Sequence, residues 1–421
     1  MSFQKYLDAL RQEIKPALGC TEPIAVALAV AKARETLGCL PERVELWVST
    51  NILKNAMGVG IPGTGMVGLE IATALSCVAG HSEYGLEVLS CAGPHDYGLA
   101  RDYAAAGTIR VQKKDTEKKL YIEVHAFAAG HEAICIIEDA HTHITLVQLD
   151  EHVLEHDAAQ TLHPGSSAVH PLDVAGIYAF ATGVDVDELR FLYDVIAMND
   201  TIAREGLSRD YGMRVGRVLQ SGRAMEEMTL SDYVCAYTSA AADARMAGST
   251  LPVMSTAGSG NQGISASLPV VAAARKLGAG EEPMLRAEAL SQLITIHIKS
   301  HIGKLSPLCG CAIASSIGSA AGIVYLLGGG MDQILFAIQN MIADISGLIC
   351  DGAKSSCALK IASSLASAVQ CAQLAMAGVT PTKLDGIIAE DPEVSIRNLA
   401  NLGSVGMNQT DRVILDMMIA K

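Results

Sequence analysis

The stretch GLICDGAKSSCALK, residues 347–360, interrupts a long apolar region with an Asp-Gly pair, lysine and two cysteines. On both sides the sequence is rich in small and apolar residues, a pattern typical of buried helices. Polar groups carried into such a core cost free energy unless they are paired or bind a ligand. The stretch therefore predicts a break between two helices and, at that break, a functional site.

The cysteines of this stretch, Cys350 and Cys357, are seven residues apart. That spacing differs from the short Cys-x-x-Cys spacing of structural zinc sites. An iron–sulfur cluster needs several thiolates but accepts them from distant parts of a chain, and Cys20, Cys309 and Cys311 are further candidates. From spacing alone, the alternative that these residues are small buried hydrophobic side chains is slightly favoured.

Four other stretches accompany residues 347–360. They are LGCTEP (18–23), STNILKN (49–55) leading into IPGTG (61–65), GSGNQG (258–263) and GKLSPLCGC (303–311). Together, these sequences resemble the L-cysteine desulfidase family, whose members are related to the iron–sulfur L-serine dehydratases. The matching stretches extend from the N-terminus to the last quarter of the chain.

The resemblance implies a 4Fe-4S cluster held by three protein thiolates, which leaves one iron open to act as a Lewis acid. Cys20 and Cys350 match the family most clearly as ligands. The third ligand is either Cys309, preferred because it follows a Ser-Pro-Leu turn, or Cys311, with Cys357 as a fallback. We also expect the cluster to be lost in aerobic preparations.

The implied reaction is a β-elimination that converts L-cysteine to pyruvate, ammonia and sulfide, so the implied enzyme is a carbon–sulfur lyase. Dehydration of L-serine or another β-hydroxy acid is the first alternative, since an open iron also activates a hydroxyl leaving group. A non-catalytic protein that binds thiols or metal is the second. Sequence leaves the choice between cysteine and serine open.

Two titratable residues in or beside these stretches, Lys54 and His301, are candidates for the base or proton shuttle. Lys54 could instead neutralise the substrate carboxylate, and His301 could cap a helix. The substrate-binding candidates are polar residues near glycines that allow close approach of the backbone: Asn51, Asn55, Thr64, Ser259 and Asn261. We expect GSGNQG to lack a preceding strand, which disfavours a dinucleotide site.

Cys20 stands just before a predicted helix that begins near Pro23. The dipole of that helix would lower the pKa of the thiol and favour the thiolate that a metal requires. The sequence thus predicts an activated thiol at Cys20.

Composition excludes several classes of protein. The formal charge of −14 and the pI of about 5.3 give no basic surface for binding nucleic acid.

Eleven cysteines, an odd number with no compact spacing, favour a reducing compartment, and the N-terminus lacks an apolar signal segment. Residues 306–331 are uncharged and long enough to span a membrane, but their serines and cysteines favour a buried helix. We expect a cytoplasmic enzyme with a small amino-acid substrate, and homo-oligomer formation stays open.

A length of 421 residues suggests two domains. An alternating pattern predicts a strand over 43–50, and short alternating segments at 108–112, 120–128, 133–138 and 144–149 predict an antiparallel sheet. After a Pro/Ser/Gly-rich linker at 163–171, nearly all patterns are helical, including 230–245, 269–277, 283–300 and 358–378. The expected fold is α+β: a first domain, 1–165, with the sheet, Cys20 and an Asn51–Gly65 loop, and an all-α second domain, 172–421, with the other cysteine motifs.

Overall fold

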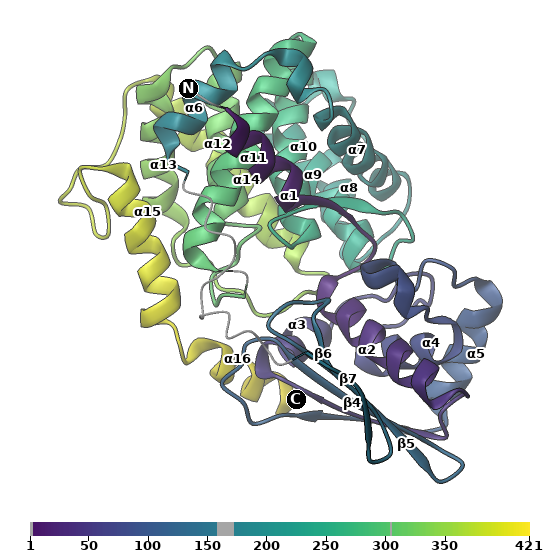
Figure 1. Cartoon of the computed structure of the whole chain (residues 1–421). Coiled ribbons are helices and arrows are strands. Elements are labelled where there is room, and N and C mark those ends of the chain that lie inside the picture. The colour runs from purple at the N-terminus through teal and green to yellow at the C-terminus, as the bar shows by residue number, and fades with distance from the viewer. Residues whose placement is uncertain (1–2, 158–171, 304) are drawn as a thin grey trace.

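The computed structural model describes residues 3–157, 172–303 and 305–421. A large helical part lies above a smaller part that is built on one sheet, as Figure 1 shows. This arrangement confirms the α+β class. The expected linker at 163–171, and with it the expected domain boundary, lies outside the described residues.

The sheet has six strands in the order β3-β2-β4-β5-β6-β7. Their bounds are β2 (Arg43–Val48), β3 (Ile109–Lys113), β4 (Tyr121–Ala128), β5 (His131–Glu138), β6 (Ile144–Leu149) and β7 (His152–His156). The antiparallel pairing is confirmed for β4, β5 and β6, whereas β3, expected over 108–112 as an antiparallel strand, pairs parallel with β2, with Val44 opposite Ile109. Strand β7 was not predicted. β2 and β3 run parallel because a helical crossover carries the chain back to the end of the sheet at which β2 begins, before β3 starts.

Four helices belong to this sheet-containing part: α2 (Thr21–Leu37), α3 (Thr50–Ala56), α4 (Leu69–Ala79) and α5 (Pro94–Ala105). Helix α2 packs on β4 and β5, where every second residue of β4 is buried. The expected loop from Asn51 to Gly65 begins instead as helix α3, because Ile52 and Ala56 on one side of that turn are buried in the core beneath the sheet.

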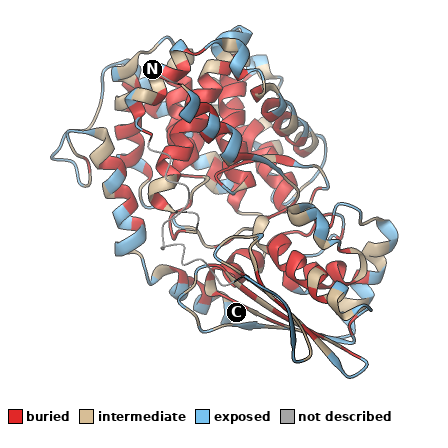
Figure 2. Cartoon of the chain, in the orientation of Figure 1, coloured by how far each residue is buried: buried red, intermediate tan, exposed pale blue. Residues whose placement is uncertain are grey.

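The helical part contains α6 (Val174–Gly183), α7 (Leu192–Ser208), α8 (Val215–Gln220), α9 (Leu230–Met246), α10 (Gly260–Leu277), α11 (Glu281–Ile302), α12 (Ala314–Leu326), α13 (Met331–Ile345), α14 (Cys357–Met376) and α15 (Pro392–Asn401). Short 3-10 and π turns, η1 (Ser82–Glu87), η2 (Val186–Leu189), η3 (Met225–Glu227) and η4 (Leu402–Gly406), complete the helical segments. Helices α9 to α12 form the buried centre, coloured red in Figure 2. Within the described ranges, no helix has the length and apolar character needed to cross a membrane.

Both ends of the chain depart from the expected division. Helix α1 (Gln4–Glu13) buries Leu10 in the core of the helical part, and β1 (Ile14–Ala17) pairs antiparallel with β8 (Val253–Thr256). At the other end, α16 (Thr410–Ile419) packs against α3 in the sheet-containing part. The second part is therefore not purely helical, since β1 supplies β8 with a partner strand, and the chain crosses between the parts near both termini.

Candidate active site

A cavity of about 110 Å³ lies where the two parts of the chain meet. It is bounded by the N-terminal ends of α2 and α10, by α11 and by the loops that precede α12 and α14. Five free cysteines line it: Cys20, Cys309, Cys311, Cys350 and Cys357. The structure thus brings together all of the cysteines that the sequence singled out, and we call this space the thiol cavity.

Two loops far apart in sequence pair through their backbones to build one wall of the thiol cavity. The amide of Cys309 donates to the carbonyl of Leu348 at 2.9 Å, and the amide of Cys350 donates to the carbonyl of Pro307 at 2.6 Å. Leu308 and Ile349 form an antiparallel bridge between these bonds. This pairing places Cys309 and Cys350 side by side although 41 residues separate them.

Cys309 and Cys311 form a close pair, with 3.5 Å between their Sγ atoms. The hydrogen bond with Cys311 lowers the pKa of Cys309 to about 7, and the amide of Ala312 acts in the same direction. The same hydrogen bond, together with burial, raises the pKa of Cys311. Within the pair, the thiolate therefore forms more readily on Cys309 than on Cys311.

Cys20 is the residue that precedes the first turn of α2, as predicted. Burial raises its pKa to about 12, and the Glu22 carboxylate adds to this effect while Arg245 opposes it. The expected activation by the helix dipole is corrected, because desolvation of a buried thiolate outweighs the dipole. A thiol of this kind ionises when a bound cation supplies compensating charge.

Cationic side chains surround the sulfur atoms. Arg245, Lys299 and Lys360 all line the thiol cavity, and Lys299 is only 6% exposed. Burial lowers the pKa of Lys299, while the nearby cysteines act in the opposite direction. A Cβ atom on Gly310 would lie 2.5 Å from Gln262 Oε1 and 3.1 Å from Lys299 Nζ, so the loop packs closely against the ends of these two side chains.

Arg245 is 3% exposed and ends helix α9. Its Nη1 donates to Asn261 Oδ1 at 3.0 Å and its Nη2 donates to the carbonyl of Gly19 at 2.7 Å. Both of these acceptors are neutral. The guanidinium therefore keeps its positive charge available to an anion in the cavity.

Ser259 and Asn261, two predicted substrate-binding residues, line the thiol cavity at the start of α10. The helix begins at Gly260 rather than at Pro269, because residues 260–268 are buried throughout and their packing outweighs the hydrogen bond that proline lacks. The strand that we expected to be absent exists as β8. It pairs antiparallel with β1, which differs from the parallel unit of a dinucleotide site.

Asn55 also lines the cavity, and its Nδ2 donates to Glu22 Oε1 at 3.0 Å. Lys54 and Asn51 lie behind the lining on the same short helix. Lys54 Nζ donates to Asp411 Oδ1 at 2.5 Å, and Asn51 Nδ2 donates to the other oxygen of that carboxylate at 2.7 Å. These two predicted residues hold α16 in place and do not border the cavity.

Thr64 and His301 also lie away from the cavity lining. The Thr64 hydroxyl donates to the carbonyl of Ile61 at 2.8 Å and so closes the glycine turn that follows α3. His301 packs against His297, with 5.0 Å between ring centroids. Some of the predicted residues therefore stabilise the fold around the cavity and do not line it.

Several polar lining residues were not named as candidates in the sequence analysis, among them Glu22, Arg245, Gln262 and Lys299. Arg245 and Lys299 each stand in the last turns of a helix whose neighbouring residues are buried. A charged residue in an otherwise apolar stretch is the signal that could have identified them, because an unpaired buried charge is costly.

A larger hollow of about 700 Å³ lies beside α2, α4 and α5. Arg34 and Glu35 in its wall form an ion pair at 3.6 Å, and the exposed Leu40 and Leu99 also line it. The thiol cavity gathers thiols, amines and a guanidinium within a smaller, buried space. It is therefore the stronger candidate for the active site.

Comparison with known proteins identifies the family of the chain. A sequence model of the family described as serine dehydratase alpha chain matches residues 99–416. A UPF0597 protein of Bacteroides thetaiotaomicron is 46% identical over 421 residues, which cover 99% of this chain and 98% of the relative. A UPF0597 protein of Oleidesulfovibrio alaskensis is 43% identical over 422 residues, covering 100% of this chain and 98% of the relative. These matches support a dehydratase or lyase type of function. The chain belongs to the serine dehydratase alpha-chain family.

Proposed function

We propose that the chain is a carbon–sulfur lyase that converts L-cysteine to pyruvate, ammonia and sulfide in the thiol cavity. The observation that carries this proposal is the convergence of five thiols and three cationic side chains on one buried space. The family match supports elimination from the β-carbon of a small amino acid. Release of pyruvate and sulfide from L-cysteine by anaerobically reconstituted protein is the test.

The donor set of the cavity suits an iron–sulfur cluster. Cys20 and Cys350 would hold it together with Cys309, while Cys311 remains the alternative third ligand. Soft thiolates are the usual ligands of such clusters, and the nearby cations offset the negative charge that they bring. When bound, a 4Fe-4S cluster with one iron free of protein ligands supplies a Lewis acid for the leaving group.

In this proposal, Arg245 binds the α-carboxylate of the substrate. Its guanidinium is buried, faces the cavity and pairs only with neutral oxygen atoms in the contacts described above. Ser259 and Asn261 lie next to it at the N-terminal end of α10, where free backbone amides favour an anion. The two features together orient the amino acid by its carboxylate.

Lys299 acts as the base, the role that the sequence analysis assigned to Lys54 or His301. Its amine borders the cavity, whereas those two side chains lie outside the lining. Burial, which lowers the pKa of Lys299, favours its neutral amine. In that form Lys299 Nζ accepts the α-proton, the electron pair of that C–H bond forms the Cα–Cβ double bond, and the Cβ–S bond breaks. The leaving sulfide keeps the electron pair of that bond, and water hydrolyses the resulting aminoacrylate to pyruvate and ammonia.

L-serine is the second candidate substrate, favoured by the family description. The same base and carboxylate site would serve a hydroxyl leaving group. Thiolate is the softer ligand and, because of its lower pKa, the better leaving group, so we place cysteine first.

Eleven free cysteines in the sequence also lead us to place the protein in the reducing cytoplasm.

A further inference from the structure

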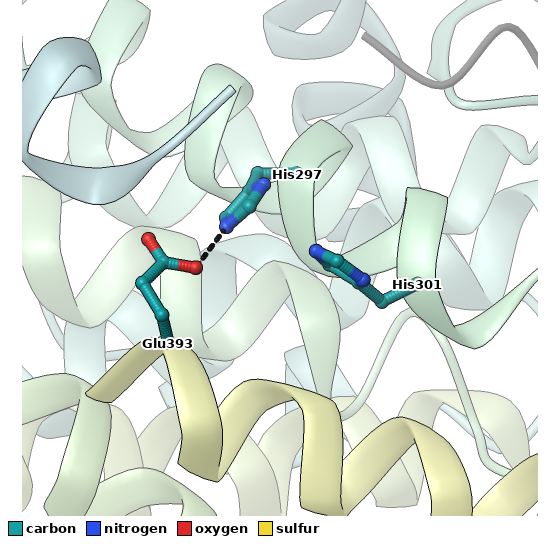
Figure 3. Close-up of side chains that lie close together, drawn as sticks. All are labelled: His297, His301 and Glu393. Carbon is teal, nitrogen blue, oxygen red and sulfur yellow. Dashed lines mark hydrogen bonds and ion pairs between the residues drawn. The ribbon is translucent and has the colours of Figure 1, made fainter. Parts of the chain in front are cut away.

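A second group of metal-binding side chains lies outside the thiol cavity. His297 and His301 stand one turn apart on α11, and Glu393 reaches them from the first turn of α15, as Figure 3 shows. One ligand atom from each of the three residues lies within 4.8 Å of the others. His297 Nε2 is 2.8 Å from Glu393 Oε2, and the two imidazole rings are 5.0 Å apart at 82°.

The group is held in place by its surroundings. His297 is only 2% exposed, and the second carboxylate oxygen of Glu393 accepts a hydrogen bond from the amide of Val174 at 2.8 Å. Nδ1 of His297 is buried and has no hydrogen-bond partner among the residues that the structure describes. That nitrogen is the one turned away from Glu393, which leaves Nε2 as the ligand atom of His297.

The chemistry of the three ligands favours zinc. Two histidines four residues apart on one helix face, with a carboxylate from another element, form a His₂Glu set that Zn²⁺ binds tetrahedrally with its fourth position open. Ca²⁺ and Mg²⁺ prefer sites made of oxygen ligands alone. Because Lys299 stands two residues after His297, it points to a different side of α11.

We propose that His297, His301 and Glu393 bind one Zn²⁺, which fastens α15 to α11. Helix α15 leads directly into η4 and α16, the segment that crosses to the sheet-containing part (Figure 1). The ion would thus stabilise the point at which the C-terminal segment leaves the helical core. This site is independent of the thiol cavity and of the proposed lyase activity.

The test is a Zn²⁺ titration of reduced, metal-free, full-length protein under argon, with a chromophoric chelator as competitor. Because thiolates are also zinc ligands, the variants His301→Ala and Glu393→Gln are compared with wild type. His152→Ala is the matched control, because His152 is an exposed histidine of β7. We expect wild type and the control to bind one more Zn²⁺ per chain than either site variant. Their melting temperature should also rise further with Zn²⁺.

Equal zinc stoichiometry in wild type and a folded His301→Ala protein would overturn the proposal. X-ray absorption at the zinc edge provides a second measurement, made on wild type alone, in case the variants fail to fold. The proposal predicts a nitrogen and oxygen shell in addition to any sulfur shell at two equivalents of Zn²⁺. A shell of sulfur alone would contradict it.

Discussion

The ammonium group of Lys54 lies 2.9 Å from the backbone carbonyl oxygen of Cys350, to which it donates a hydrogen bond. Lys54 is 1% exposed and also pairs with Asp411, so one buried cation joins α3, α16 and a loop of the thiol cavity. Gly352, with φ of +92°, packs so closely on the Lys54 carbonyl that a Cβ atom would clash. These contacts hold the loop that carries Cys350 in place in the wall of the thiol cavity.

Replacing Lys54 with methionine should lower the free energy of unfolding by about 3–5 kcal/mol, because Asp411 would be left buried without its cation. Lys383→Met is the control, since the Lys383–Glu390 pair is exposed and spans 3.5 Å. The control should lose less than about 1 kcal/mol. Urea unfolding followed by circular dichroism measures both, and similar small losses would show that the buried pair does not stabilise the fold.

Cys20→Ser and Cys350→Ser should each abolish retention of iron and acid-labile sulfide after anaerobic reconstitution. Both residues line the thiol cavity and supply ligands in the proposal. Cys39→Ser is the control, because Cys39 is exposed and lies outside this cavity. Chemical analysis of iron and sulfide per chain makes the comparison. Full iron content in folded Cys20→Ser protein would remove Cys20 from the site.

The same assay distinguishes Cys309 from Cys311, the two candidates for the third ligand. We expect Cys309→Ser to lose more iron, because the hydrogen bond with Cys311 lowers the pKa of Cys309 and the Cys309 amide is bonded to the opposite loop. A larger loss in Cys311→Ser would assign the third ligand to Cys311 instead.

Lys299→Met should lower kcat by about 10²- to 10⁴-fold, the usual contribution of a positioned base, while iron content stays unchanged. Lys299→Arg should not restore activity, since a guanidinium stays protonated. Lys276→Met is the control, because Lys276 donates to the carbonyls of Met225 and Glu226 at the far end of α10. Steady-state pyruvate formation is the measurement, and a kcat close to wild type in Lys299→Met would assign the base elsewhere.

Local patterns in the sequence predicted five of the six strands of the sheet, all except β7, and most helices. The strand expected over 120–128 is observed as Tyr121–Ala128, and the helix expected over 230–245 is observed as Leu230–Met246. Alternation and helical spacing are properties of neighbouring residues, so one sequence is enough to detect them. The start of α10 was missed because the cost of Pro269 is local, whereas the packing that overcomes it is tertiary.

The site was predictable only in part, for a related reason. The cysteines stand in recognisable motifs, but the contact between Cys309 and Cys350 depends on hydrogen bonds between two distant loops. Lys299 has no motif of its own and becomes a site residue through the tertiary packing of the Gly310 loop against it. Lys54 stands inside a motif, but its ammonium group pairs with Asp411 because α16 packs against the sheet-containing part.

The most direct test of the central claim is a substrate comparison on anaerobically reconstituted, cluster-loaded protein. L-cysteine and L-serine are supplied separately under argon, and pyruvate is measured for both, with sulfide as a second product from cysteine. We predict that kcat/KM for cysteine exceeds that for serine by at least about tenfold, equivalent to about 1.4 kcal/mol of transition-state stabilisation. Equal rates would assign the protein as a dehydratase, and absence of turnover of either amino acid would contradict the proposed lyase activity.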